Sequence, residues 1–207
     1  GKYRFFGTGK NHHPFRTGIF VTCGQHTAMD SSRGRDPSPT ADRERSVQLL
    51  ELTADREIPH LRVWRPPRHV AFGRRDCSRE GYDRALEHVQ QRYIPAIERT
   101  TGGHAVFFTG NTVSVVLATP IEDARSGITE RYERATDRFR AGLSELGVDA
   151  SEGEPDGAFC PGTHSLSAEG KIVGLAQRVR RDVSVLAGIV VVTDHEEIDA
   201  VLGPIYD

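Results

Sequence analysis

Hydrophobic positions follow two spacings along this chain and predict an α+β protein. Three segments space apolar residues as in amphipathic helices: residues 37–54, 79–92 and 122–147, with a fourth helix beginning at residue 195. Runs rich in valine, isoleucine and phenylalanine predict strands at residues 60–65, 69–73, 94–99, 104–108, 112–118 and within 164–192. Because the strands cluster instead of alternating strictly with helices, we expect a central mixed β-sheet flanked by helices.

The ends of some elements are marked by particular residues. Thr40 is expected to cap the first helix, and Gly147 to end the third. Turns are expected at residues 168–170 and near residues 181–182, which would make 164–192 a set of neighbouring antiparallel strands.

The first part of the chain differs in charge from the rest. Residues 1–28 contain four Lys or Arg and no Asp or Glu, which leaves 23 basic and 29 acidic residues beyond them, and the single methionine is Met29. We expect translation to start at Met29 and residues 1–32 to be a flexible or non-native leader; a native basic arm is the alternative. Residues 33–207 then form one catalytic domain, which is expected to be truncated at its C-terminus.

Overall charge and cysteine content narrow the function classes. A formal net charge of −2 argues against a nucleic-acid binder that relies on phosphate contacts. No apolar run approaches the ~20 residues that cross a bilayer. The three cysteines, Cys23, Cys77 and Cys160, show no paired metal-ligand spacing, so we expect no metal site and a reducing, cytoplasmic setting.

Lysine is almost absent from this arginine-rich chain. Lys2 and Lys10 lie in the leader, and Lys171 is the only lysine after it. An ammonium is more compact than a guanidinium and fits a tighter site, so Lys171 is a candidate functional residue. An incidental turn lysine is the alternative.

Two further stretches carry candidate chemistry. Gly102 and Gly103 separate two strands and allow a ligand to approach the backbone, although such pairs also occur in plain hairpin turns. His104 beside them is a candidate base or a structural histidine. Cys160 lies in "FCPG"; it is either a small buried apolar residue or a nucleophile, which a nearby cation would favour as the thiolate.

Three stretches together resemble the catalytic-domain family of biotin and lipoate protein ligases. "RTTGGHAVFFTGN" resembles the family's arginine and Gly-Gly signature, "GKIVGLAQR" its lysine strand, and "RVWRPPRHVAFGRRD" its early paired strands. Their order and spacing agree from about Arg33 to Asp207. The resemblance implies a mixed-sheet fold like that of class II synthetase cores, and an acyl group bound between the Gly-Gly loop and Lys171. It implies these substrate-binding residues: Arg99, Gly102, Gly103, His104, Ala105, Val106, Gly174, Ala176 and Gln177.

Within the family, the stretch "FCPGTHSLSAEGKIVGLAQR" is most similar to the cysteine-dependent octanoyl-[glycine cleavage H protein]:protein N-octanoyltransferases. That resemblance implies that Cys160 is the nucleophile and Lys171 its electrostatic partner. The implied reaction carries an octanoyl or lipoyl group through a thioester to a lysine of a lipoyl carrier domain, either the glycine cleavage H protein or the E2 subunit of a 2-oxoacid dehydrogenase, without a cofactor. The acyl pocket would include residues 113–116, and arginines between Arg178 and Arg181 would steer an acidic carrier unless they only solvate a strand end.

Two alternatives stay open. An ATP-dependent lipoate–protein ligase would need ATP and Mg²⁺ and form lipoyl-AMP; a non-catalytic module would only bind a lipoyl domain. His104 stands where the ligases usually have a third glycine, which is expected to narrow the pocket or to disfavour a nucleotide.

Overall fold

The computed structural model describes residues 36–99, 103–160 and 162–206. The expected leader, Cys23 and Gly102 therefore lie outside the described residues. These residues contain four α-helices, α1 (Pro39–Arg56), α2 (Tyr82–Gln91), α3 (Ile128–Glu145) and α4 (His195–Tyr206), together with a short 3₁₀ helix, η1 (Asp76–Ser78). The strands are β1 (His60–Trp64), β2 (His69–Gly73), β3 (Ala96–Arg99), β4 (Val106–Phe108), β5 (Val113–Pro120), β6 (Ser151–Glu152), β7 (Leu166–Ser167), β8 (Lys171–Val179) and β9 (Val183–Val190).

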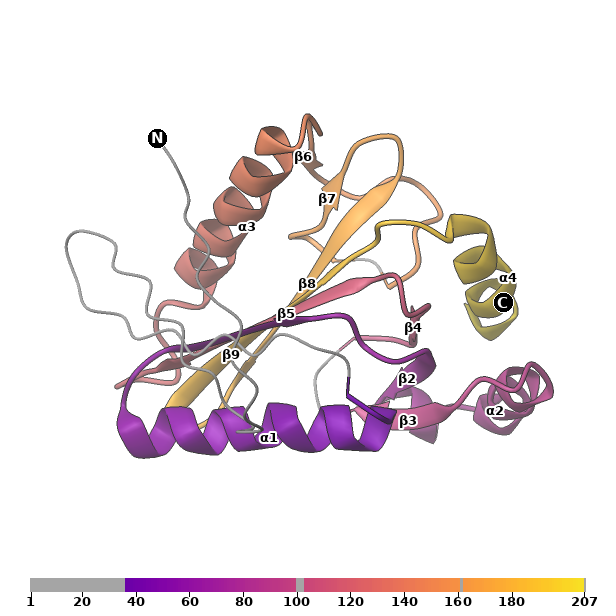
Figure 1. Ribbon diagram of the computed structural model, residues 1–207, viewed down its shortest axis with the longest axis horizontal. Helices are drawn as coiled ribbons and strands as arrows, with labels where there is room; N and C mark the ends of the chain where they lie inside the picture. Colours follow the sequence, from indigo (N-terminus) through magenta and orange to yellow (C-terminus); the bar gives the residue numbers. More distant parts are fainter. Residues whose placement is uncertain (1–35, 100–102, 161, 207) are drawn as a thin grey trace, which may run out of the picture.

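The strands divide between two sheets, which confirms the α+β prediction and refines it. The larger sheet has the order β1-β5-β9-β8-β7-β6 and is antiparallel throughout. The smaller has the order β3-β2-β4, with β2 parallel to β3 and antiparallel to β4. Only the smaller sheet mixes strand directions. In Figure 1 it lies at one end of the molecule with α2 and α4.

The first helix begins earlier than the predicted cap at Thr40 implies. Ser38, not Thr40, is the N-cap, and its side-chain oxygen accepts a hydrogen bond from the Ala41 amide at 3.2 Å. Pro39 occupies the first helical position, where the fixed φ of proline suits the helix and its missing N–H costs nothing. The expectation for Thr40 was wrong because the proline already commits the chain to the helix.

Helices α1 and α3 cover opposite faces of the larger sheet (Figure 1). Leu49 of α1 packs with Trp64, Val116 and Val185 on one face. On the other, the ring of Phe139 from α3 lies so close to Gly188 that a Cβ there would be 2.8 Å from the ring. Since side chains alternate along a strand, residues 113–116 of β5 cannot all line one acyl pocket. Val116 belongs to the core under α1, which corrects that part of the expected lining.

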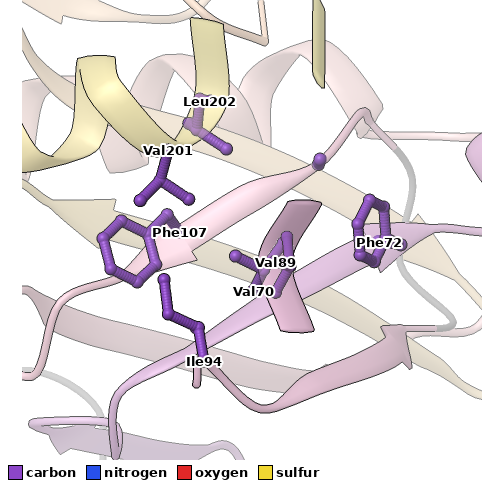
Figure 2. Close-up of a cluster of buried hydrophobic side chains, with 8 residues drawn as sticks. Val70, Phe72, Val89, Ile94, Phe107, Val201 and Leu202 are labelled. Atoms are coloured by element: carbon purple, nitrogen blue, oxygen red, sulfur yellow. The ribbon is translucent and has the colours of Figure 1, made fainter. Parts of the chain in front are cut away.

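A separate core holds the smaller sheet in place. Val70, Phe72 and Phe107 from β2 and β4 pack against Val89 of α2 and Val201 of α4, as Figure 2 shows. These side chains are almost fully buried. The cluster fixes the ends of β2 and β3 and the start of β4, where the candidate site lies.

Two details complete the comparison with the sequence. The two-residue strand β6 was not expected, because a strand that short has no alternation to detect. Within the described part of the chain, no helix has the length and apolar character needed to cross a membrane.

Candidate active site around Cys160

The site begins where the two parallel strands of the smaller sheet end. Gly73, the last residue of β2, pairs with Arg99, the last residue of β3. The backbone of Gly103 lies directly against Gly73: a Cβ on Gly73 would be 2.0 Å from the carbonyl oxygen of Gly103. Gly103 itself has φ +91°, which an L side chain rarely adopts. Glycine is therefore needed at both positions for this loop to close on the sheet.

Cys160 reaches this loop from the other side. It lies in residues 153–165, between β6 and β7, and its φ of 51° is in the left-handed region, which is uncommon for a cysteine. Its sulfur accepts a hydrogen bond from the His104 amide at 3.4 Å, and a Cβ on Gly103 would lie 3.0 Å from that sulfur. A strained residue whose thiol faces a backbone N–H is typical of a functional position.

Lys171 meets Cys160 through the backbone. Its ammonium donates to the carbonyl oxygens of Cys160 at 2.7 Å and Phe159 at 3.1 Å, and to Oε1 of Glu154 at 2.5 Å. A lysine ammonium has three N–H donors, so these contacts use all of them. Lys171 thus reaches Cys160 across this hairpin, but the contact runs to the carbonyl oxygen of Cys160 and not to its sulfur. That the two side chains converge stays a prediction.

Glu154 ties the rest of the cysteine loop to Lys171. Its Oε2 accepts hydrogen bonds from the Gly162 amide and, at 3.1 Å, from the Ser165 hydroxyl. Partial burial alone would raise the pKa of Glu154, but the Gly162 amide and Lys171 outweigh burial and hold this pKa below its usual range. The carboxylate thus holds the chain after Cys160 directly, and Phe159 and Cys160 through Lys171.

His104 is held through both its ring and its carbonyl oxygen. Its Nδ1 lies 2.9 Å from Oδ1 of Asp76 in η1, and its carbonyl oxygen accepts a hydrogen bond from Arg99. Oδ2 of Asp76 in turn accepts from the Gly73 amide at 3.0 Å. The imidazole is 34% exposed, whereas the Asp76 carboxyl is 11% exposed. A buried carboxylate therefore orients a ring that still faces the open side of the site.

Tyr206 closes the site from α4. Its hydroxyl donates to the carbonyl oxygen of Ala105 at 2.8 Å, and its ring contacts those of His104 and Phe159. Burial, and next the neighbouring Cys160, raise the pKa of Tyr206 above its ordinary value. The phenol therefore keeps its proton and donates it in the hydrogen bond to Ala105.

The structure brings some of the expected residues together and leaves others apart. Arg99, Gly103, His104, Ala105 and Lys171 all surround Cys160. Gly174 lies against the Lys171 side chain: a Cβ on Gly174 would be 3.5 Å from Cε of Lys171. Val106 and Ala176 are ordinary strand residues, which pair with Ala71 and Ala187.

Gln177 does not reach this cluster. It lies six residues along β8 from Lys171, roughly 20 Å away at the rise of an extended strand. Its amide accepts from Arg131 Nε at 2.6 Å and donates to the Ile128 carbonyl, so it holds the first turn of α3. The turn at Arg180 and Arg181 lies farther along the same hairpin, remote from Cys160.

Sequence reasoning missed Asp76, Glu154 and Tyr206. Asp76 follows β2 directly, a position that often carries chemistry, but nothing in "GRRDCS" links it to His104. Glu154 and Tyr206 lack any local pattern. Among the described residues, no group of three or more His, Cys, Asp or Glu side chains is arranged to hold a metal ion.

Residues 44–205 match the lipoyl protein ligase A/B catalytic domain family. The chain belongs to this family. It is 30% identical over 127 residues to an octanoyl-[GcvH]:protein N-octanoyltransferase of Geobacillus kaustophilus, an alignment that covers 60% of this chain and 45% of the relative. It is 28% identical over 172 residues to the octanoyltransferase LipM of an Exiguobacterium species, covering 74% of this chain and 62% of that protein.

The fold matches solved members of the family as well. The bipartite lipoate protein ligase of Thermoplasma acidophilum, described with its E2 lipoyl domain, superposes with a TM-score of 0.64 at 22% identity, covering 84% of this chain and 66% of that one. The resemblance seen in the sequence is thereby confirmed at the level of family and fold. The chain spans about half the length of the first curated relatives it matches.

Proposed function

We propose that this protein is an acyltransferase that carries an octanoyl or lipoyl group, through a thioester on Cys160, to a lysine of a lipoyl carrier domain. The observation that carries the proposal is the presentation of the Cys160 sulfur to the His104 amide on a left-handed turn fastened by Lys171. The names of the relatives in Geobacillus and Exiguobacterium support the acyl group and the carrier class.

In the first half-reaction the Cys160 thiolate attacks the acyl carbonyl of the donor. A C–S bond forms, the carbonyl oxygen takes the negative charge, and collapse of the tetrahedral intermediate expels the donor's amine. The His104 amide, which already points at the sulfur, is suited to stabilise the oxyanion as a backbone donor. In the second half-reaction the amine of the acceptor lysine attacks the thioester and frees the thiol.

Lys171 has a positioning role in this proposal. Its three N–H groups bind Glu154 and the carbonyls of residues 159 and 160, so it fixes the turn that aims the thiol. A direct bond from Lys171 to the oxyanion requires it to release one of these carbonyls. Its positive charge still lies beside the reacting residue and favours a thiolate there.

Arg99 is the strongest substrate-binding candidate of the predicted set. Its Nε is buried and has no hydrogen-bond partner among the described residues. A buried donor left unpaired costs free energy, so a ligand oxygen that accepts from it is favoured. Gly102, Gly103, His104, Ala105 and Val106 remain the proposed neighbours of the acyl carbonyl, with Gly174 and Ala176 on β8.

No ATP is needed for this reaction, and the proposed partners are the glycine cleavage H protein and E2 lipoyl domains in the cytoplasm. The ATP-dependent ligase remains the second candidate, because solved proteins of this fold include lipoate protein ligases. The two differ in their need for Cys160 and for ATP.

The test is intact-mass spectrometry of the protein with octanoylated glycine cleavage H protein and no ATP. A hydroxylamine-labile octanoyl adduct is expected on the wild type, absent from Cys160→Ser and retained by the matched control Cys77→Ser. Acceptor modification only with ATP, Mg²⁺ and free lipoate, and unaffected by Cys160→Ser, would identify a ligase. Binding of a lipoyl domain with no turnover in either assay would identify a non-catalytic module.

A further inference from the structure

The proposed reaction requires a proton carrier beside Cys160, and this inference rests on that reaction. An acylated carrier lysine is an amide, so its nitrogen must gain a proton before it leaves as an amine. The acceptor lysine must lose a proton when its amine forms the new amide. Acyl transfer from amide to amide through a thiol therefore needs a group that gives and takes one proton in each cycle.

Most ionisable groups around the sulfur are unsuited to this task. Lys171 has its three protons committed to Glu154 and two carbonyls. Arg99 stays protonated, since a guanidinium does not release a proton in proteins. Tyr206 keeps its proton because burial raises its pKa. Asp76 is directed at His104 and at the Gly73 amide. The Glu154 carboxylate is bound to Gly162, Ser165 and Lys171.

His104 is not committed in this way, and its surroundings fix its tautomer. The Asp76 carboxylate accepts at Oδ1 from Nδ1 at 2.9 Å, so Nδ1 carries the proton and Nε2 carries the lone pair. A carboxylate that orients a histidine in this way also stabilises the imidazolium formed when Nε2 takes up a proton. The second oxygen of Asp76 is itself fixed by the Gly73 amide at 3.0 Å.

His104 lies beside the sulfur that is proposed to react. The amide of the same residue is 3.4 Å from the Cys160 sulfur, and Arg99 holds its carbonyl. The ring contacts that of Tyr206, and about a third of the side chain stays exposed and accessible to a substrate amine.

We propose that His104, oriented by Asp76, is the acid–base group of this acyltransferase. Nε2 takes the proton of the Cys160 thiol as the sulfur attacks, and gives it to the departing amine of the donor. It then takes a proton from the attacking amine of the acceptor and returns it to the sulfur as the C–S bond breaks. Each half-reaction begins and ends with a neutral imidazole and requires no other reactant.

The leaving group distinguishes this role from a structural one. Both donors require the Cys160 thiol to lose its proton, and without His104 that proton can pass to water, since the charge of Lys171 favours the thiolate. The donors differ in the leaving group: a thiophenyl ester of octanoate releases a thiolate that needs no proton, whereas octanoylated glycine cleavage H protein releases an amine that does. The experiment measures the rate of Cys160 acylation from both donors by intact mass. His104→Gln is expected to slow acylation from the protein amide by about 10²-fold or more, the usual contribution of general acid–base catalysis, and from the thiophenyl ester by under about tenfold.

Two further variants keep the test independent of folding. Added imidazole is expected to restore part of the amide reaction in His104→Ala, because the site is open to solvent. His164→Gln is the matched control: His164 also binds a carboxylate, Glu152, through Nδ1 at 3.0 Å, but stacks on Tyr132 of α3. It is expected to acylate at the wild-type rate from both donors.

Equal losses of His104→Gln with both donors, or no loss with either, would overturn the proposal. A wild type that acquires no acyl group from either donor would instead remove the proposed function itself. Asp76→Asn is expected to reduce the amide reaction selectively, because an amide holds the ring without stabilising the imidazolium.

Discussion

The ammonium of Lys171 donates a hydrogen bond to the carbonyl oxygen of Cys160 at 2.7 Å. The residue that carries the thiol is thus held by its backbone, with its left-handed φ maintained by the same lysine that binds Glu154. This relationship explains why one lysine occurs in a body otherwise supplied with arginine. A compact ammonium can donate to three oxygens that converge on one point. The larger, planar guanidinium of arginine cannot reproduce this geometry.

Replacement of Lys171 by arginine is therefore expected to impair acylation severely. The larger guanidinium displaces the turn at Cys160, and a shift of roughly 1 Å in a reacting group costs about 10²-fold in rate. The measurement is the rate of octanoyl adduct formation on Cys160, together with the unfolding free energy. A Lys171→Arg variant that acylates within about threefold of the wild type would show that charge alone suffices there.

Glu154 is expected to make stability depend on pH in acid. Its pKa is lower in the folded protein than its ordinary value of 4.5. A carboxyl of this kind stabilises the fold above its unfolded pKa and loses that contribution as the pH falls through the folded value. The destabilisation by Glu154→Gln should thus be full near neutral pH and shrink below pH 4.5.

The measurement is denaturant unfolding of both proteins between pH 3 and pH 7. Glu145→Gln, at the exposed end of α3, controls for the loss of one negative charge. A difference between wild type and Glu154→Gln that stays constant across this range, or grows in acid, would contradict the role of the Glu154 ion pair.

Gly73 and Gly103 must both remain glycine for their backbones to touch. A Cβ on Gly73 would lie 2.0 Å from a backbone oxygen that no rotamer change can move. Overpacking of this kind typically costs about 1–3 kcal/mol, so Gly73→Ala should lower the unfolding free energy by that amount and abolish acylation.

Gly142→Ala is the matched control, because nothing lies within 4 Å of its Cβ position in α3. There the substitution should stabilise the protein by about 0.5–1 kcal/mol, since alanine favours a helix. Chemical denaturation of the two variants measures both effects. Equal effects of the two substitutions would argue against the close contact between Gly73 and Gly103.

The family resemblance and the structure predict different roles for Gln177. The family resemblance implies substrate binding, whereas both ends of its amide hold α3 in this structure. Gln177→Ala is expected to lower the unfolding free energy by roughly 1–3 kcal/mol, the cost of unpaired partners, and to leave the acylation rate nearly unchanged. A variant with wild-type stability and a much weaker affinity for the acyl donor would support the resemblance instead.

The sequence predicted the elements well where periodicity was long. The helices at α1, α2 and α3 and the hairpin of β8 and β9 follow from spacing and turn residues. The family motif singled out Cys160 and Lys171, and their roles stay proposals. The motif does not show that Gln177 and Lys171 have different surroundings. They lie roughly 20 Å apart along β8, and the Gln177 amide is bound to α3.

The partners of the site residues were beyond sequence reasoning for a different reason. Asp76 and His104 are 28 residues apart and meet only because β2 and β4 are neighbours in the smaller sheet. Tyr206 meets Ala105 across 101 residues through the packing of α4. Such contacts depend on tertiary packing, and no local pattern encodes them.

If the acyl group passes through Cys160, the thioester there must form and decay at least as fast as the enzyme turns over. The measurement is a rapid-quench experiment that follows the octanoyl adduct on the Cys160 peptide after a lipoyl-domain acceptor is added to pre-acylated protein. The adduct is expected to decay with the same rate constant as the acceptor gains the octanoyl group, at least as fast as steady-state turnover. An adduct that persists while the acceptor is modified, or that forms more slowly than turnover, would contradict the thioester route.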